Sequence, residues 1–153
     1  MVVQGFHHTS FTVSDMERSL AFYRDLLGMQ VVVDRITSDT YLSEITGFPN
    51  VRLHIVYLRL DVPDGHVLEL VEYQSHPGQA ERLQTNNPGV GHLCFVVDDL
   101  PALYEQLRTA GTTFVSPPIE ITSGVNKGGY AVYLRDPDGS PLELLQPPPK
   151  TAA

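Results

Sequence analysis

The chain has 153 residues, 42% of them hydrophobic and 18% charged, which is typical of a folded globular domain and not of a disordered chain. A net charge of −8 and the lack of any run of basic residues disfavour nucleic acid as a partner, and the single cysteine excludes an intramolecular disulfide. The sequence shows neither a secretory signal nor an apolar run of about 18 residues, so we expect a cytoplasmic protein without a membrane partner.

The first predicted elements are a strand and a helix. The strand begins at His8 and is rich in β-forming residues as far as Val13. Ser14 or Asp15 can cap the helix that follows, and Gly28 ends it. Apolar residues recur between these limits at helical spacing: Leu20, Phe22, Tyr23, Leu26 and Leu27.

The first half closes with further strands and reads strand–helix–strand–strand–strand as a whole. Residues 51–60 are rich in Val, Leu, Ile and Tyr, and the Pro-Asp-Gly at 63–65 predicts a turn into the next strand. That strand carries Glu69 within Val-Leu-Glu-Leu-Val. Because a buried carboxylate is costly unless it is paired or bound to a metal, Glu69 is a candidate functional residue.

The second half repeats this order. It opens at His92, continues into a helix that Asp98 or Asp99 can cap, and closes with Pro-Asp-Gly followed by Glu143. In both halves an Asp lies seven residues after the His, and the Glu lies four residues after the Gly of the turn. Such a match at several positions indicates two copies of one module.

The repeat predicts an α+β fold of two paired βαβββ modules, each a helix on one face of a mostly antiparallel sheet. We expect one domain over residues 1–147. Its modules would cover 5–73 and 90–147, joined by a connector at 74–89, and residues 148–153 would form a tail.

Four repeat-matched residues are the candidate metal ligands: His8, Glu69, His92 and Glu143. Side chains alternate between the faces of a strand, so a pseudo-twofold axis between the modules would bring all four into one cleft. Two imidazoles and two carboxylates suit one divalent ion such as Ni, Co, Zn, Mn or Fe(II). The alternative is that each His is structural and each Glu faces solvent at a sheet edge.

Substrate-binding candidates come from less constrained segments. Residues 116–129 predict a flap over the cleft, with glycines as hinges, where Asn126 and Lys127 could contact an anionic substrate. An ordinary solvated hairpin is the alternative for this segment. Further candidates for lining the pocket are Tyr41, His54, Tyr57, Tyr130 and Tyr133, although side-chain alternation should turn about half of them toward the core or solvent.

Motifs in three segments carry a resemblance to a known family. They are His-x4-Val-x-Asp-Met-x3-Leu-x-Phe-Tyr-x3-Leu-Gly at 8–28, Gly-His-Leu-Cys-Phe-x-Val-Asp-Asp-Leu at 91–100 and Tyr-Leu-x-Asp-Pro-Asp-Gly-x3-Glu-Leu at 133–144. Over about residues 5–147 the chain resembles the vicinal oxygen chelate superfamily, and within it glyoxalase I and methylmalonyl-CoA epimerase most. The resemblance implies paired βαβββ modules around a metal, a homodimer, and ligands at the same four positions.

The resemblance also implies a reaction. A metal-dependent isomerase, epimerase or lyase would chelate a small oxygenated carbonyl compound or its thioester, with Glu143 or Glu69 transferring the proton. Thr12 stands where bacterial glyoxalase I has an Arg that binds a glutathione carboxylate, which disfavours glutathione. An iron-dependent dioxygenase and a metal-free drug-binding protein are the alternatives, and the substrate and the metal stay open.

Overall fold

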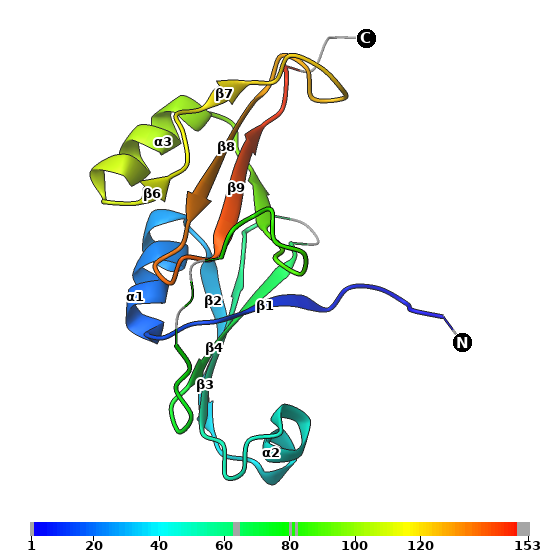
Figure 1. Ribbon diagram of the computed structural model, residues 1–153, viewed down its shortest axis with the longest axis vertical. Coiled ribbons are helices and arrows are strands. Elements are labelled where there is room, and N and C mark those ends of the chain that lie inside the picture. Colours follow the sequence, from blue (N-terminus) through cyan, green and yellow to red (C-terminus); the bar gives the residue numbers. More distant parts are fainter. Residues whose placement is uncertain (1, 63–64, 80, 82, 150–153) are drawn as a thin grey trace. The chain divides into compact units, whose positions relative to one another are not determined.

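The computed structural model describes residues 2–62, 65–79, 81 and 83–149 (Figure 1). The chain divides into two compact units, Met1–Ala80 and Glu81–Ala153, and each is considered by itself. Each unit contains one of the predicted modules, whereas the single domain over 1–147 with its connector stays a prediction. Pro63 and Asp64 of the first predicted turn, and residues 150–153 of the predicted tail, lie outside the described residues.

Unit 1 is a four-stranded sheet with helices on both of its faces. Its elements are β1 (His8–Thr12), α1 (Met16–Leu20) with the π-helical turn η1 (Ala21–Leu26), β2 (Gln30–Thr37), α2 (Thr40–Thr46), β3 (Leu53–Arg59) and β4 (Val67–Tyr73). The strand order is β1-β4-β3-β2, with β1 parallel to β4 and the other pairs antiparallel. The first and last strands of the module are therefore neighbours.

Unit 2 repeats this topology. Its elements are β5 (Leu93–Val96), α3 (Leu100–Thr109), β6 (Thr113–Phe114), β7 (Ile119–Glu120), β8 (Tyr130–Arg135) and β9 (Pro141–Gln146). The order is β5-β9-β8-β6, with β7 also paired to β8 and β5 parallel to β9. Two matching backbone bonds of 2.9 Å, Val13 N–H to Val71 and Val97 N–H to Leu145, show that the parallel pairing has the same register in both units. The α+β fold of two βαβββ units is thus confirmed.

The helices begin and end at the positions that the repeat predicts. Asp15 accepts a hydrogen bond of 3.0 Å from the backbone N–H of Arg18, and Asp99 accepts one of 3.0 Å from Ala102. Both are N-cap bonds, which satisfy backbone donors that a helix start leaves unpaired. The structure therefore selects Asp15 over Ser14 as the cap of α1, and Asp99 over Asp98 as that of α3.

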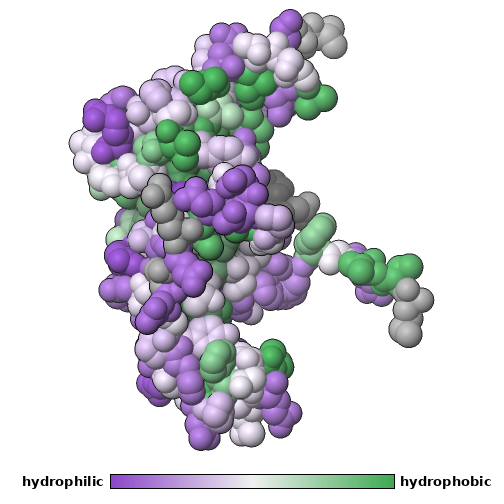
Figure 2. Space-filling model, viewed as in Figure 1, coloured by the Kyte–Doolittle hydropathy of each residue, from purple (hydrophilic) through white to green (hydrophobic). Residues whose placement is uncertain are grey.

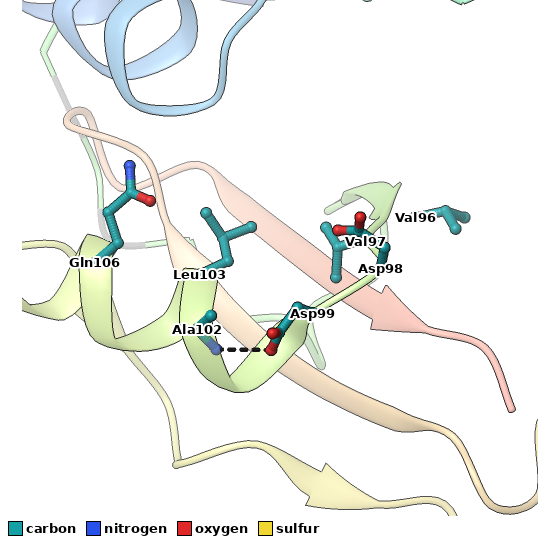
Figure 3. Close-up of a pocket in the computed structure, with 7 residues that line it drawn as sticks. All are labelled: Val96, Val97, Asp98, Asp99, Ala102, Leu103 and Gln106. Carbon is teal, nitrogen blue, oxygen red and sulfur yellow. Dashed lines mark hydrogen bonds between the residues drawn. The ribbon is translucent and has the colours of Figure 1, made fainter. Parts of the chain in front are cut away.

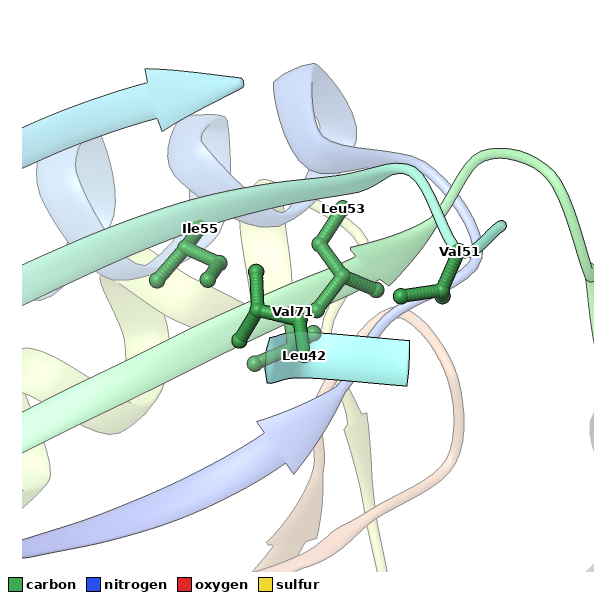
Figure 4. Close-up of a cluster of buried hydrophobic side chains, with 5 residues drawn as sticks. All are labelled: Leu42, Val51, Leu53, Ile55 and Val71. Carbon is green, nitrogen blue, oxygen red and sulfur yellow. The ribbon is translucent and has the colours of Figure 1, made fainter. Parts of the chain in front are cut away.

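One helix was not predicted. Helix α2 lies on the face of the unit 1 sheet that also carries Glu69, and its Leu42 joins a buried apolar cluster there (Figure 4). The other members of the cluster are Val51, Leu53, Ile55 and Val71. Leu42 is the only buried residue of this seven-residue helix, so its sequence lacks the apolar periodicity that announces a longer helix.

The opposite face of the sheet holds most of the unit 1 core. Val56, Leu58, Leu68 and Leu70 are buried there, on the side against which α1 packs. The segment before β1, by contrast, extends away from its own sheet (Figure 1) and leaves hydrophobic residues in the open (Figure 2). Phe6, for example, is 97% exposed. In the described part of the chain no helix has the length and apolar character needed to cross a membrane.

Candidate metal-binding half-sites

The first candidate half-site pairs His8 with Glu69. In the parallel β1–β4 ladder Ser10 is the partner of Glu69, so His8 lies on the same face, two residues earlier. His8 Nε2 is 3.4 Å from Glu69 Oε2, and the two side chains are 34% and 14% exposed. The other ring nitrogen, Nδ1, is 2.8 Å from Nδ1 of His7. This contact orients the imidazole with Nε2 toward the carboxylate.

The second half-site has the same construction in unit 2. Cys94 is the β5–β9 partner of Glu143, as Ser10 is of Glu69, and His92 again precedes the partner residue by two positions. His92 Nε2 is 3.0 Å from Glu143 Oε2. Each predicted His is thus brought together with the predicted Glu of its own module.

A tyrosine completes each pair. Tyr57 is the cross-strand partner of Glu69, and Tyr133 is that of Glu143. The Tyr57 ring stacks near His8 at 6.1 Å between centroids, and the Tyr133 ring meets His92 edge-on at 5.1 Å. Tyr133 was a predicted pocket residue. Tyr57 was another predicted pocket residue, and its equivalence to Tyr133 agrees with the repeat of Tyr-Leu-Arg at 57–59 and 133–135.

The two phenols and the thiol beside the Glu residues remain neutral near pH 7. Burial and then Glu69 raise the pKa of the Tyr57 phenol, and burial and then Glu143 raise the pKa of Tyr133. Burial, followed by the charge of Glu143, raises the pKa of the Cys94 thiol to about 11. These phenols and this thiol therefore bring no negative charge of their own, and their O–H and S–H groups can donate hydrogen bonds to the carboxylates.

The donor atoms fit a divalent cation. An imidazole nitrogen and a carboxylate oxygen bound to one ion lie about 2.1 Å from it, which separates them by roughly 3.0 Å at a right angle and about 3.4 Å at a tetrahedral angle. The observed separations, 3.4 Å for His8–Glu69 and 3.0 Å for His92–Glu143, are in this range. Within the described residues of the chain no group of three or more His, Cys, Asp or Glu forms a metal-binding cluster. Convergence of both pairs on one ion stays a prediction.

His54 lies on the other face of the unit 1 sheet. It is three residues from Tyr57 on β3, so its side chain points away from Glu69. Its Nε2 is 2.7 Å from Asp34 Oδ1, and its Nδ1 is 3.7 Å from Glu72 Oε2. His54 therefore lies on the α1 face of the sheet and does not reach Glu69 there, and its contact with substrate stays a prediction.

Asn126 and Lys127 lie in the turn between β7 and β8. The Lys127 N–H donates to Gly124, and the Gly129 N–H donates to Asn126, so this part of the predicted flap is a hydrogen-bonded turn. The turn lies beyond the Tyr130–Gln146 end of the β8–β9 ladder. Gln146 is three residues from Glu143, or about 10 Å along a strand. Unit 2 does not bring the two residues against Glu143, and their substrate contact stays a prediction.

A separate pocket of about 600 Å³ lies where β5 runs into α3 (Figure 3). Its lining consists of Val96, Val97, Asp98, Asp99, Ala102, Leu103 and Gln106. Asp99 is occupied in capping α3, as the dashed bond to Ala102 shows. Neither His92 nor Glu143 lines this pocket, so it is not part of the candidate metal site.

Fold and sequence together define the class of protein. The model of the Glyoxalase/Bleomycin resistance protein/Dioxygenase superfamily matches residues 5–144, nearly the whole chain, and the protein belongs to that superfamily. The predicted resemblance is thereby confirmed. Enzymes and resistance proteins share this family, so membership alone does not define an activity.

Individual proteins resemble this chain in sequence or in structure. The chain is 29% identical to a lactoylglutathione lyase of Pseudomonas aeruginosa over 92% of its own length and 81% of the relative's. A glyoxalase family protein of Bacillus cereus superposes with a TM-score of 0.83, at 18% identity and 97% coverage of both chains. A glyoxalase/bleomycin resistance protein/dioxygenase domain from Frankia superposes with a TM-score of 0.68, at 25% identity over 95% of this chain and 99% of that one.

Proposed function

We propose that this protein is a divalent-metal-dependent lyase or isomerase that acts on a small oxygenated carbonyl compound or its thioester. The observation that carries the proposal is the pair of repeat-matched His–Glu contacts at 3.4 Å and 3.0 Å. In the proposal, His8, Glu69, His92 and Glu143 bind one ion per chain. That stoichiometry is the same whether both pairs come from one chain or from two chains of the expected homodimer.

The donor set limits the chemistry. When bound, a divalent ion would act as a Lewis acid on the carbonyl oxygen of a substrate and so favour loss of the neighbouring proton. Glu143 or Glu69 would accept that proton and return it elsewhere, because a carboxylate beside the reacting carbon can serve as base and then as acid. Tyr57 and Tyr133, the cross-strand partners of these carboxylates, would stay protonated themselves.

The relatives support a lyase of the glyoxalase type and leave the thiol component of the substrate open. The name lactoylglutathione lyase belongs to a protein with 29% identity to this chain. Here Thr12 lies on the Glu69 face, beside Val71, in place of the Arg that bacterial glyoxalase I is expected to use for glutathione. We therefore propose a substrate other than a glutathione adduct.

Metal titration of chelator-treated protein tests the site. Isothermal titration with Ni²⁺, Co²⁺ and Zn²⁺ should give one tight ion per chain for the native protein. Glu69→Gln and Glu143→Gln should each lower the affinity at least tenfold, although they lie in different units. His54→Gln, which removes an imidazole from the other face of the same sheet, serves as the matched control and should bind like the native protein.

Separate outcomes identify the alternatives. Native protein that takes up no divalent ion would exclude the metal-dependent enzyme in favour of a binding protein. Two weak and independent ions, each lost with only one of the two Glu variants, would show that the pairs do not share a metal. Consumption of oxygen with catechols after loading with Fe²⁺, measured at an oxygen electrode, would point to a dioxygenase. Proton exchange in a carbonyl substrate, followed by NMR in D₂O and lost in Glu143→Gln, would support the proposal.

A further inference from the structure

The two half-sites differ at one charged position. Two residues further along the strands from Glu69, on the same face, a row of paired residues crosses the sheet. In this row Thr12 of β1 pairs with Val71 of β4, and Val71 pairs with Ile55 of β3. Ile55 in turn pairs with Arg35 of β2. Arg35 is thus on the same face as Glu69, two strands away. In unit 2 the residue that pairs in the same way, with Ala131 of β8, is Ile119. The two half-sites therefore share the His, the Glu and the Tyr, but only the unit 1 half-site has an Arg at this position.

Arg35 is near Tyr57 and near the helix that the repeat does not explain. Its guanidinium shares a side-chain hydrogen bond with Tyr41 of α2, and this bond is the main cause of the raised pKa of Arg35. The charge of Asp39 acts on the same guanidinium, and Asp39 already accepts a hydrogen bond of 2.7 Å from Thr37. Tyr57, whose pKa is raised by burial and then by Glu69, lies on β3. This strand stands between β4, which carries Glu69, and β2, which carries Arg35.

A structural role does not account for Arg35. Helix α2 is attached to the sheet by buried Leu42 in its apolar cluster, whereas Tyr41 is 49% exposed. Exposed polar contacts of this kind contribute little to stability. A guanidinium has five N–H donors in a planar fork, so one bond to Tyr41 leaves capacity for a carboxylate.

We propose that Arg35 binds an anionic group of the substrate, a carboxylate, while the carbonyl end of the substrate lies at the metal ligands. The inference rests on the proposed function and narrows its substrate class to carbonyl compounds that carry an acid group. Arg35 lies two strands across the sheet from Glu69 and two residues further along. Strand spacing and rise per residue then place their Cα atoms about 12 Å apart. An extended Arg side chain spans about half of that distance. The acid group should therefore lie only a few bonds from the chelating oxygens.

A matched pair of probes tests this proposal without knowledge of the natural substrate. Hydroxamates chelate divalent ions through two neighbouring oxygens. The monohydroxamate of succinic acid carries a carboxylate two methylenes away, and 4-methylpentanohydroxamate has an isopropyl group of the same shape in its place. The Kd of each would be measured by calorimetry on the Ni²⁺-loaded protein.

Native protein should prefer the acidic probe at least tenfold, since a charge-assisted bond to a carboxylate is lost with the isopropyl group. Arg35→Gln should abolish the preference without changing the affinity for the neutral probe or for Ni²⁺, and Arg35→Lys should retain part of it. Arg52→Gln, which removes a cation whose Nε donates to Gln74 at 3.0 Å, should bind both probes like the native protein.

Other results would overturn the inference. Equal binding of both probes to the native protein would refute it while leaving the metal site intact. Loss of the preference in Arg59→Gln but not in Arg35→Gln would assign the carboxylate to a different cation on this face of β3. An Arg35→Gln variant that unfolds at a lower temperature yet keeps its preference would show that Arg35 only attaches α2. Failure of both probes to bind would refute the proposed function together with this inference.

Discussion

Tyr57 is the cross-strand partner of Glu69 in the β3–β4 ladder, where burial, the charge of Glu69 and hydrogen bonding with it raise the pKa of the phenol. A protonated phenol beside the carboxylate can donate a hydrogen bond to Glu69 and so orient it. Groups that orient a metal ligand in this way commonly contribute 10- to 100-fold to metal affinity. The relationship leads to the first prediction.

Tyr57→Phe should lower the affinity for Ni²⁺ about tenfold, because it leaves Glu69 in place but removes the donor that holds it. Isothermal titration of chelator-treated protein measures the change. Tyr73→Phe is the matched control, since Tyr73 lies on the same face, pairs with Leu53 and contacts Phe48 at 5.6 Å between ring centroids. An equal loss in both variants would contradict a specific role for Tyr57.

Cys94 should react slowly with alkylating agents. With a pKa of about 11, it is almost entirely a neutral thiol at pH 8, and only the thiolate is nucleophilic. Iodoacetamide should therefore modify it about a hundredfold more slowly than N-acetylcysteine in chelator-treated protein at this pH. Mass spectrometry over time gives the rate.

The same reaction reports on Glu143. Glu143→Gln removes the negative charge that, after burial, contributes most to the raised pKa. The pKa of Cys94 should then fall toward its ordinary value, and alkylation at pH 8 should accelerate severalfold. Because burial remains, it should stay slower than in guanidinium-unfolded protein. A native rate equal to that of N-acetylcysteine would show that the thiol is not protected.

The caps of α1 and α3 should contribute similarly to stability. Asp15→Ala and Asp99→Ala each remove an N-cap bond of 3.0 Å, and each should lower the free energy of unfolding by about 1 kcal/mol. Urea denaturation followed by circular dichroism measures both. Asp99→Asn keeps a side-chain acceptor and should be close to the native protein. Ser14→Ala and Asp98→Ala should lower the free energy of unfolding less than Asp15→Ala and Asp99→Ala do, because Ser14 and Asp98 do not cap the helices.

The β7–β8 turn gives a prediction about the supposed hinges. A Cβ at Gly129 would collide with the backbone oxygen of Gln146 and lie 3.1 Å from the oxygen of Asn126. Gly129→Ala should therefore destabilise the protein by about 1–3 kcal/mol or misplace β8. Gly124, with φ +77° and no atom within 4 Å of a built Cβ, should tolerate Ala at about 1 kcal/mol. Native stability in Gly129→Ala would mean that the turn moves freely, as the flap prediction requires.

The repeat is visible in the amino-acid sequence alone, and it predicts which His and Glu meet within each module. His8 and Glu69 could be paired in advance because alternating apolar residues define the face of each strand, and because the same pattern recurs around His92 and Glu143. The helix limits followed for a similar reason, since caps and terminal glycines act locally. Such interactions involve residues only a few positions apart, so they can be predicted without knowing how the rest of the chain folds.

Features that depend on pairing between distant strands became known only from the folded structure. Periodicity within β2 or β3 does not reveal which residue of one strand stands beside which residue of another, and a shift by one residue moves a side chain to the opposite face. The register places Arg35 on the same face as Glu69, and His54 on the face of α1. Helix α2 likewise depends on Leu42 reaching an apolar cluster formed by β3 and β4. The residues that make the two half-sites different were therefore hidden from the sequence, whereas those that make them alike were visible in it.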